Sequence, residues 1–196
     1  MNYYIMDNGG LRYPIDRRSN FSAMPKGGYT NIVSEAQTNL LMIRAANKIS
    51  SEYEPYPLGI QNINQIKNWS PNGAPWDFKP QRDYLNPNSL YIMNGVAQQY
   101  EVAGNALWGA GMKAIGVPEW EAKLAAQAAS LRDNNLKFDD PREQDAISYA
   151  YRASAVTSSP DESFFATDET SSSAAGRSLL YPNKPNTNMM RSVYGK

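Results

Sequence analysis

The sequence predicts a mainly α-helical fold, with a minor β element that would make it α+β. Two observations lead to this prediction. Apolar residues recur at helical spacing in several stretches, and capping or helix-breaking residues bound these stretches. With 196 residues, of which 41% are hydrophobic, the chain can bury the core of one compact multi-helix domain. We expect an irregular N-terminal arm over residues 1–33, a helical domain over 34–153 and a polar C-terminal tail over 154–196.

The arm contains paired glycines, prolines and tyrosines, which favour short strands or irregular structure over a helix. The first helix is expected after Ser34, because Ser34 and Gln37 fit a capping box. The apolar residues that recur from there at helical spacing, to about residue 50, are Ala36, Leu40, Ile43, Ala46 and Ile49. This pattern predicts an amphipathic helix.

Prolines and tryptophans punctuate residues 54–87, a composition typical of an ordered loop. Its tetrapeptide 76–79 alternates aromatic and charged residues, so we expect a short β element near residues 74–80 or near the N-terminus. A second helix is predicted from about residue 88 or 89 to 114. Gly104, Gly109 and Gly111 weaken it by roughly 1 kcal/mol each relative to alanine, so close helix contact or a functional site must compensate.

A third helix is expected to open at Pro118, because proline suits a first turn and the acids that follow complement the helix dipole. Its predicted buried stripe is Trp120, Leu124, Ala128 and Leu131. A fourth helix is expected to open at Asp140–Pro141, with Ala146, Ile147, Ala150 and Tyr151 facing inward. Beyond residue 153 the chain is rich in Ser and Thr and then in Pro and Asn, which predicts an extended or partly disordered tail.

The composition excludes several kinds of chemistry. The sequence contains no cysteine and no histidine, which removes thiolate chemistry and the usual Ser-His and Cys-His pairs. Any catalysis must therefore use carboxylates, Lys, Tyr or amides, and any metal would be an oxygen-ligated Mg or Ca. We expect no cofactor. Lys and Arg together number 19, as do Asp and Glu, so no overall basic field attracts nucleic acid.

The chain has no apolar run long enough for a transmembrane helix, and its start lacks the features of a signal peptide. We therefore expect no membrane span, and export, where it occurs, by a machine that needs no signal peptide.

The first candidate site is a block of acids, Asp139, Asp140, Glu143 and Asp145. Asp140 and Glu143 also fit the N-cap and the capping box of the fourth helix, which is a purely structural use. Closely spaced carboxylates suit a divalent cation, or a carboxyl group whose pKa is raised by its neighbours.

The second candidate site lies in the second predicted helix. Glu101 and Asn105 are four residues apart and share a face, with Tyr100 and Trp108 nearby. A glutamate beside an amide and an aromatic wall fits the general acid of a glycosidase. The alternative is a solvated glutamate on a helix whose small residues serve a tight helix crossing.

The third candidate site comprises Asp77 and Lys79, with Trp76 beside them. Trp76, Tyr100 and Trp108 are residue types that stack on sugars or bases. The alternative is a surface ion pair between Asp77 and Lys79, with the tryptophans used in the core.

Three blocks in order, residues 76–79, 104–117 and 139–147, resemble the polymorphic toxin type 44 domain over roughly residues 70–153. The positions that match are Asp77 and Lys79 in the first block, Asn105, Trp108, Gly109 and Gly116 in the second, and Asp140, Pro141, Gln144 and Ile147 in the third. Two positions differ. Leu107 stands where members often carry histidine, and Glu143 stands for the second acid of the last block.

The resemblance implies an antibacterial effector of interbacterial competition. Such a toxin is secreted without a signal peptide and delivered into a target bacterial cell by a contractile machine, as in type VI secretion, or by a contact-dependent one. The implied partners are a secretion-machine carrier and a cognate immunity protein.

The resemblance implies a hydrolase without fixing the bond that is cleaved. The residues favour hydrolysis of peptidoglycan glycan strands by carboxylate general acid/base chemistry, because that reaction needs no histidine. One alternative is a nuclease toxin that cleaves RNA, with or without Mg. Another is a non-enzymatic structural component of a phage or secretion particle.

Overall fold

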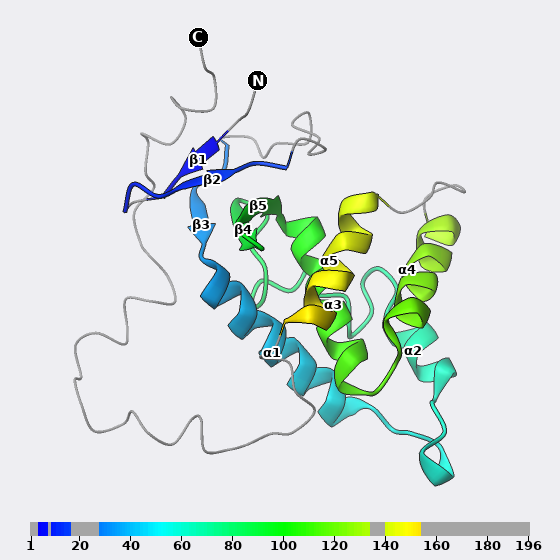
Figure 1. Ribbon diagram of the computed structural model, residues 1–196. Coiled ribbons are helices and arrows are strands. Elements are labelled where there is room, and N and C mark those ends of the chain that lie inside the picture. The colour runs from blue at the N-terminus through cyan, green and yellow to red at the C-terminus, as the bar shows by residue number, and fades with distance from the viewer. Residues whose placement is uncertain (1–3, 8, 17–27, 134–139, 154–196) are drawn as a thin grey trace, which may run out of the picture.

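The computed structural model describes residues 4–7, 9–16, 28–133 and 140–153, and the tail over 154–196 lies outside these ranges. The fold is mainly α-helical with a minor β part, as predicted. In Figure 1, helices α1, α3 and α5 pack together at the centre and the strands lie at one end of them. Helices α2 and α4 lie on the side of this group that is away from α1. Within the described residues, no helix is long and apolar enough to cross a membrane.

Helix α1 spans Glu35–Glu52 and begins with the predicted capping box between Ser34 and Gln37. The predicted stripe is confirmed at Ala46 and Ile49, which are buried, and wrong at Leu40, which is 49% exposed. The face that packs inward consists of Thr38, Met42, Ala45, Ala46 and Ile49. The prediction followed apolar spacing alone, whereas the helix also buries Thr38 and packs Ile49 against Gly111 of α3.

The predicted second helix is wrong over residues 89–99, which form a β-hairpin. Strand β4 spans Ser89–Met93 and pairs antiparallel with β5, Val96–Gln99. Between them, Asn94 and Gly95 have φ angles of 52° and 71°. Asn-Gly is the preferred pair for a two-residue hairpin turn with positive φ at both positions. Their two backbone amides donate to the carboxylate of Glu35, at 2.8 and 3.1 Å, which holds the turn against α1.

The sheet crosses the boundary predicted at residue 33. Strand β3, Asn31–Val33, pairs in parallel with β4 and gives the order β3-β4-β5. A separate hairpin of β1, Tyr4–Met6, and β2, Arg12–Pro14, precedes it. Ile15 forms an isolated bridge with Ala97 of β5. The N-terminal segment is therefore joined to the strand that leads directly into α3.

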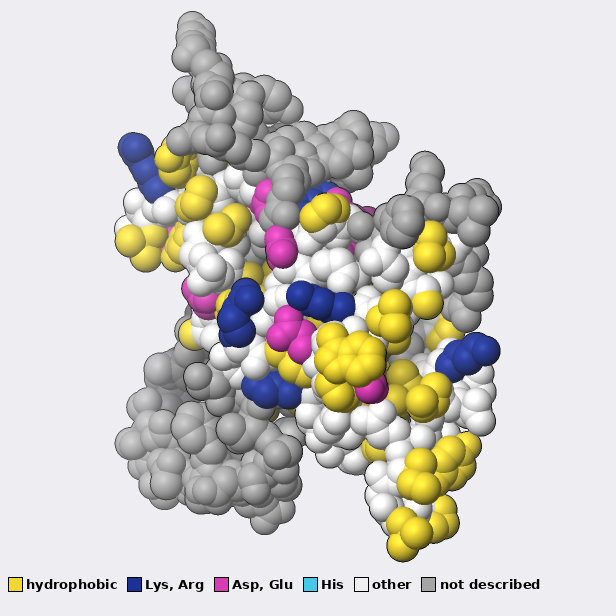
Figure 2. Space-filling view, turned by 45° about the vertical axis from the view of Figure 1, so that its right-hand side comes forward, with side chains coloured by type: hydrophobic (Ala, Val, Ile, Leu, Met, Phe, Trp, Pro, Cys, Tyr) yellow, Lys and Arg dark blue, Asp and Glu magenta, His cyan; other side chains and the backbone are white. Residues whose placement is uncertain are grey.

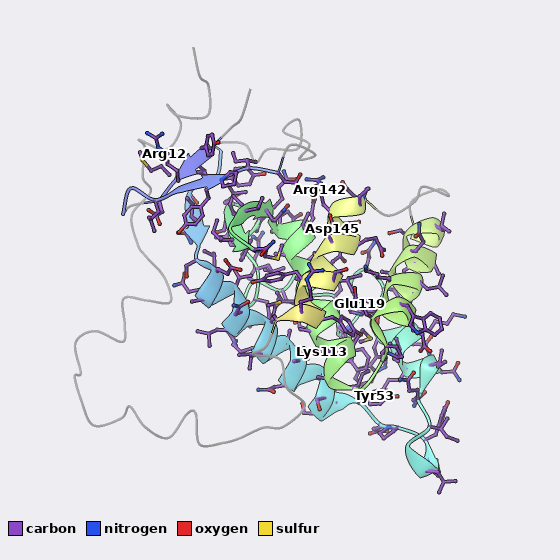
Figure 3. All side chains as sticks on the ribbon, viewed as in Figure 1. Arg12, Tyr53, Lys113, Glu119, Arg142 and Asp145 are labelled. Carbon is purple, nitrogen blue, oxygen red and sulfur yellow. The ribbon has the colours of Figure 1, made fainter. Side chains whose placement is uncertain are left out.

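Helices α3, Tyr100–Ala114, and α5, Pro141–Arg152, lie side by side and run in the same direction. Arg142 at the start of α5 reaches Gln99 at the start of α3, and Lys113 at the end of α3 donates to the carbonyl of Ala153. Figure 3 shows Arg142 and Lys113 at opposite ends of this pair. A Cβ on Gly109 would lie 3.2 Å from Cα of Ile147, so glycine is what permits the close crossing.

Residues 54–87 are more ordered than the expected loop. They contain a 3₁₀ turn, Pro57–Gly59, and helix α2, Ile63–Trp69, which Asn62 caps by accepting from the amide of Gln65. Of the two places predicted for a short β element, the N-terminal one is confirmed by β1 and β2, whereas residues 74–80 form a series of turns. Asp77 directs it by accepting hydrogen bonds from the amides of Gly73 and Lys79, at 2.8 and 3.1 Å.

Helix α4 spans Glu119–Asp133, but its predicted buried stripe is wrong. Trp120 and Leu124 are 65% and 62% exposed, and it is Ala122 that enters the core. Ala128, also in the predicted stripe, is exposed as well. Figure 2 shows hydrophobic side chains on this side of the molecule, down to the protruding turn that carries the exposed Leu58.

The inward-facing residues of α5 are as predicted. Ala146, Ile147 and Ala150 are buried, and Tyr151 is half-buried and donates from its hydroxyl to the carbonyl of Val117 at 2.7 Å. This contact joins the end of α5 to the start of α4.

Candidate functional site

A cleft of about 630 Å³ opens between α2, α3, α4 and the loop over residues 70–79. One half is apolar, from Ile63 and Ile66 of α2 and the alanines of α4. The polar residues of the lining come from α2, the loop, α3, α4 and the first turn of α5: Lys67, Ser70, Asn72, Asp77, Lys79, Tyr100, Glu101, Asn105, Ser130 and Glu143.

The cleft brings together most of the residues singled out in the sequence. Those that line it are Trp76, Asp77, Lys79, Tyr100, Glu101, Asn105, Trp108 and Glu143. Asp140 and Asp145 are not among its lining residues, and Asp139 lies outside the described residues. The three sequence blocks therefore meet at one place, although the last block contributes Glu143 alone of its acids.

Two carboxylates reach the cleft from the starts of parallel helices. Glu101 is in the first turn of α3, and Glu143 is in the first turn of α5. The N-terminus of a helix carries partial positive charge, so each position favours a negative side chain. The parallel packing of α3 and α5 places both carboxylates at the same end of the helix pair.

Lys79 lies between the loop and these helices. Its Nζ is 3.6 Å from Oε1 of Glu143, and the two side chains are 31% and 19% exposed. Its stem crosses α3 at Gly104, where an added Cβ would lie 2.6 Å from Cγ of Lys79. Gly104 is thus the position that leaves room for the lysine to reach Glu143.

An amide and two aromatic residues complete the polar half. Asn105 is one helical turn after Glu101 and partly exposed. Trp108, one turn further, is 9% exposed, and its indole N–H donates to Oγ of Ser70 at 2.9 Å. The pKa of Tyr100 is raised, mainly by partial burial and then by the negative charge of Glu101 beside it.

Trp76 and Asp77 support the cleft more than they face it. Trp76 is fully buried, its indole donates to Oε2 of Glu52 at 2.9 Å, and it meets the ring of Trp69 edge to face at 5.4 Å between centroids. A side chain with no exposed surface cannot stack on a substrate, so the predicted substrate-binding role of Trp76 is replaced by a packing role. Asp77 uses both carboxylate oxygens to hold the loop that carries Lys79.

Leu107, at the position where type 44 members often carry histidine, is fully buried in the core and does not line the cleft. On α3 the cleft receives Glu101, Asn105 and Trp108, and the side chain at 107 points to a different face. A leucine in place of histidine at this position therefore does not change which polar side chains line the cleft.

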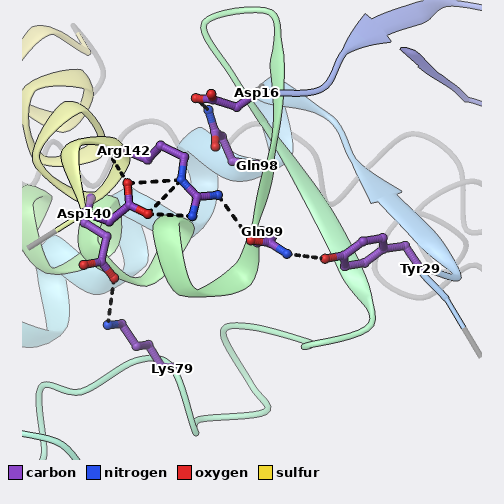
Figure 4. A network of polar contacts seen from close by, with 8 residues as sticks. Asp16, Tyr29, Lys79, Gln98, Gln99, Asp140 and Arg142 are labelled. Atoms are coloured by element: carbon purple, nitrogen blue, oxygen red, sulfur yellow. Dashed lines mark hydrogen bonds and ion pairs between the residues drawn. The ribbon is translucent and has the colours of Figure 1, made fainter. Parts of the chain in front are cut away.

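Asp140 caps α5, as predicted, by accepting from the amide of Arg142 at 2.9 Å. Sequence reasoning missed Arg142, which is the unspecified position of the last block. Its guanidinium is paired with Asp140 and also donates to Oε1 of Gln99, whose Nε2 donates to the hydroxyl of Tyr29 (Figure 4). A charged residue between a proline and a glutamate at a helix start gives no sequence signal of such burial.

Other cleft residues that the sequence did not single out are Lys67, Ser70 and Asn72. They lie in a helix that was not predicted and in the turn that follows it, so no periodicity could indicate them. Among the described residues, no group of three or more His, Cys, Asp or Glu side chains is placed to hold a metal ion.

No protein-family model, curated protein or solved structure matches this chain. The resemblance to the polymorphic toxin type 44 domain stays a prediction that rests on its motif residues.

Proposed function

We propose that this protein is an antibacterial effector toxin that hydrolyses the glycan strands of peptidoglycan in the cleft between α2, α3 and α4. The observation that supports this most is the convergence of Glu101 and Glu143 on one cleft with Asn105. Two carboxylates are the machinery of most glycoside hydrolases, and a sequence without histidine can supply it.

The surroundings of the two carboxylates differ, which supports a division of roles. The ammonium of Lys79 lies 3.6 Å from the carboxylate of Glu143, so we assign Glu143 the role of base or nucleophile. Glu101 is the other glutamate of the cleft lining, and we assign it proton donation to the glycosidic oxygen. Asn105, one turn along the same helix, orients the sugar by donating and accepting hydrogen bonds.

The charge of the cleft favours a glycan over RNA as the substrate. Two lysines, Lys67 and Lys79, line it against three carboxylates, Asp77, Glu101 and Glu143, so the lining carries a net charge of −1. A phosphodiester backbone binds where positive charge releases its counterions. An N-acetylated glycan backbone carries no phosphate and needs no such field. The apolar half of the cleft, between α2 and α4, adds area for the faces of sugar rings.

The resemblance over residues 70–153 supports the biological setting of this proposal. The toxin is carried by a secretion machine into the target cell and is inhibited in the producing cell by an immunity protein. Such an inhibitor is expected to cover the cleft or its rim.

The test compares two compartments of a susceptible bacterium. The protein directed to the periplasm should lyse the cells, whereas the same protein kept in the cytoplasm should leave them growing. Glu101→Gln and Glu143→Gln should each abolish lysis, since loss of a general acid or base costs about 10²–10⁴-fold in rate. Asp145→Asn is the matched control, because this exposed carboxylate is on α5 but outside the cleft. Killing from the cytoplasm with RNA loss would instead favour the nuclease.

A further inference from the structure

Arg142 forms the link between the two helices that carry the cleft carboxylates. It is 7% exposed, and its Nε and Nη2 donate to the carboxylate of Asp140 at 3.0 and 2.6 Å. Its Nη1 donates across to Oε1 of Gln99 at 3.3 Å, and Nε2 of Gln99 donates to the hydroxyl of Tyr29 at 2.6 Å. Figure 4 shows this continuous chain of contacts from Asp140 to Tyr29.

The linked residues are direct neighbours of the proposed catalytic pair. Arg142 immediately precedes Glu143 in the first turn of α5. Gln99 is the N-cap residue of α3, two positions before Glu101, and its side chain makes no capping bond. The side-chain amide is instead used for Arg142 and Tyr29, so it joins the start of one helix to the start of the other.

We propose that Arg142 is a positioning residue, which sets the spacing and orientation of Glu101 and Glu143 through Gln99 and Tyr29. The expected effect of Arg142 on catalysis rests on the proposed function. Its expected effect on the positions of the two carboxylates rests on the contacts alone. The close crossing at Gly109 and Ile147 fixes the two helices further along. Arg142 provides the second fixed point, at the end where the carboxylates lie.

Physical chemistry favours a geometric role over a purely stabilising one. Burying a charge carries a large desolvation cost, and well-packed apolar residues often replace buried ion pairs without loss of stability. The guanidinium supplies something that apolar packing does not, which is a rigid fork of directional donors. Carboxylate separation determines which glycosidase mechanism operates, so small changes in spacing alter the rate.

The same contacts make the N-terminal segment part of the site. Tyr29 precedes β3, and its hydroxyl is the last member of the chain from Arg142. Removing that hydroxyl should take away one of the two side-chain hydrogen bonds that hold the amide of Gln99 and leave the one from Arg142. Tyr29→Phe is therefore the mildest available perturbation of the carboxylate spacing.

The experiment compares Tyr29→Phe and Arg142→Lys with Tyr91→Phe. Tyr91 is a matched control, because its hydroxyl also accepts a 2.6 Å hydrogen bond, from the amide of Asn86, but lies in β4 away from the cleft. On purified peptidoglycan, we expect kcat to fall about threefold to tenfold in Tyr29→Phe and more in Arg142→Lys, with KM little changed. Tyr91→Phe should retain kcat even where its melting temperature falls.

A second readout does not depend on activity. The ¹³C carboxyl resonances of Glu101 and Glu143 should shift in Tyr29→Phe and stay in place in Tyr91→Phe. Unmoved resonances in Tyr29→Phe, or equal kcat in the two tyrosine variants, would overturn the positioning role. A wild-type protein that cleaves no glycan would overturn the proposed function alone, because the resonance comparison still reports whether Arg142 and Tyr29 position the pair.

Discussion

Substitution by alanine should have different effects at two glycines of α3, Gly104 and Gly111. Gly104→Ala adds a methyl group that would lie 2.6 Å from Cγ of Lys79, whose side chain is partly exposed and can move. Gly111→Ala adds the same group against Ile49, with Cγ1 at 2.9 Å, where the isoleucine is fully buried and cannot leave. The first change should therefore affect the cleft, and the second should affect the core.

The magnitudes follow from these contacts. In either variant alanine adds about 1 kcal/mol of helix propensity relative to glycine. In Gly104→Ala the displaced Lys79 gives up a partly exposed ion pair worth about 0.2–1 kcal/mol, so the free energy of unfolding should stay within about 1 kcal/mol of the wild type. In Gly111→Ala overpacking costs about 1–3 kcal/mol, so the variant should be up to about 2 kcal/mol less stable.

Urea unfolding followed by circular dichroism, with dye release from labelled peptidoglycan, measures both effects. Gly104→Ala should lose about tenfold or more in rate at nearly unchanged stability, because the ammonium of Lys79 no longer lies beside Glu143. Gly111→Ala should keep its rate per folded molecule. The reasoning fails if Gly104→Ala retains full activity, or if the two variants lose stability equally.

Two further predictions concern the scaffold. Gly95→Ala should lower the free energy of unfolding by about 1–2 kcal/mol in urea titration, because the hairpin turn holds this residue at φ 71° with no side chain nearby to clash; an unchanged midpoint would contradict the strain. The second variant is Glu119→Gln. In the wild type the pKa of Glu119 is lowered, first by the hydrogen bond from Ser148 and then by Lys123. The carboxylate therefore stabilises the fold above its ordinary pKa of 4.5, and this contribution is lost as the pH falls through the lower pKa of the folded state. Since its side chain is 40% exposed, the variant should be less stable by under about 1 kcal/mol at pH 7, and the gap should close in acid; a gap that widens in acid would contradict the assigned direction.

The helix starts were predictable because their signals are local. The capping box of Ser34 and Gln37 and the Asp140–Pro141 start both need only contacts within one turn. The hairpin at residues 89–99 was also signalled locally, by Asn94–Gly95. The apolar residues on either side were instead interpreted with helical spacing, which short strands also satisfy by chance.

The direction of the helix faces was not predictable from spacing. On α4 the larger residues Trp120 and Leu124 point outward, and Ala122 is the residue that enters the core. On α1 a buried threonine replaces the expected apolar position. Such choices depend on the partner helix, which a single amphipathic pattern does not identify.

The sequence was enough to predict several of the residues that line the candidate site, but not which of them contact one another. The sequence placed Glu101, Asn105, Lys79 and Glu143 among the candidates, and all four line one cleft. The pairing of Lys79 with Glu143, across 64 positions of the chain, and the burial of Arg142 depend on tertiary packing. These contacts determine which of the many acids share a site.

The most direct test of the central claim is mass spectrometry of purified peptidoglycan after incubation with the purified protein. The wild type should release fragments with new reducing sugar ends, and Glu101→Gln and Glu143→Gln should each release them at least about 10²-fold more slowly while Asp145→Asn matches the wild type. Glycan strands left intact by the wild type, or equal rates in the wild type and both glutamine variants, would contradict the claim that this cleft cleaves glycosidic bonds.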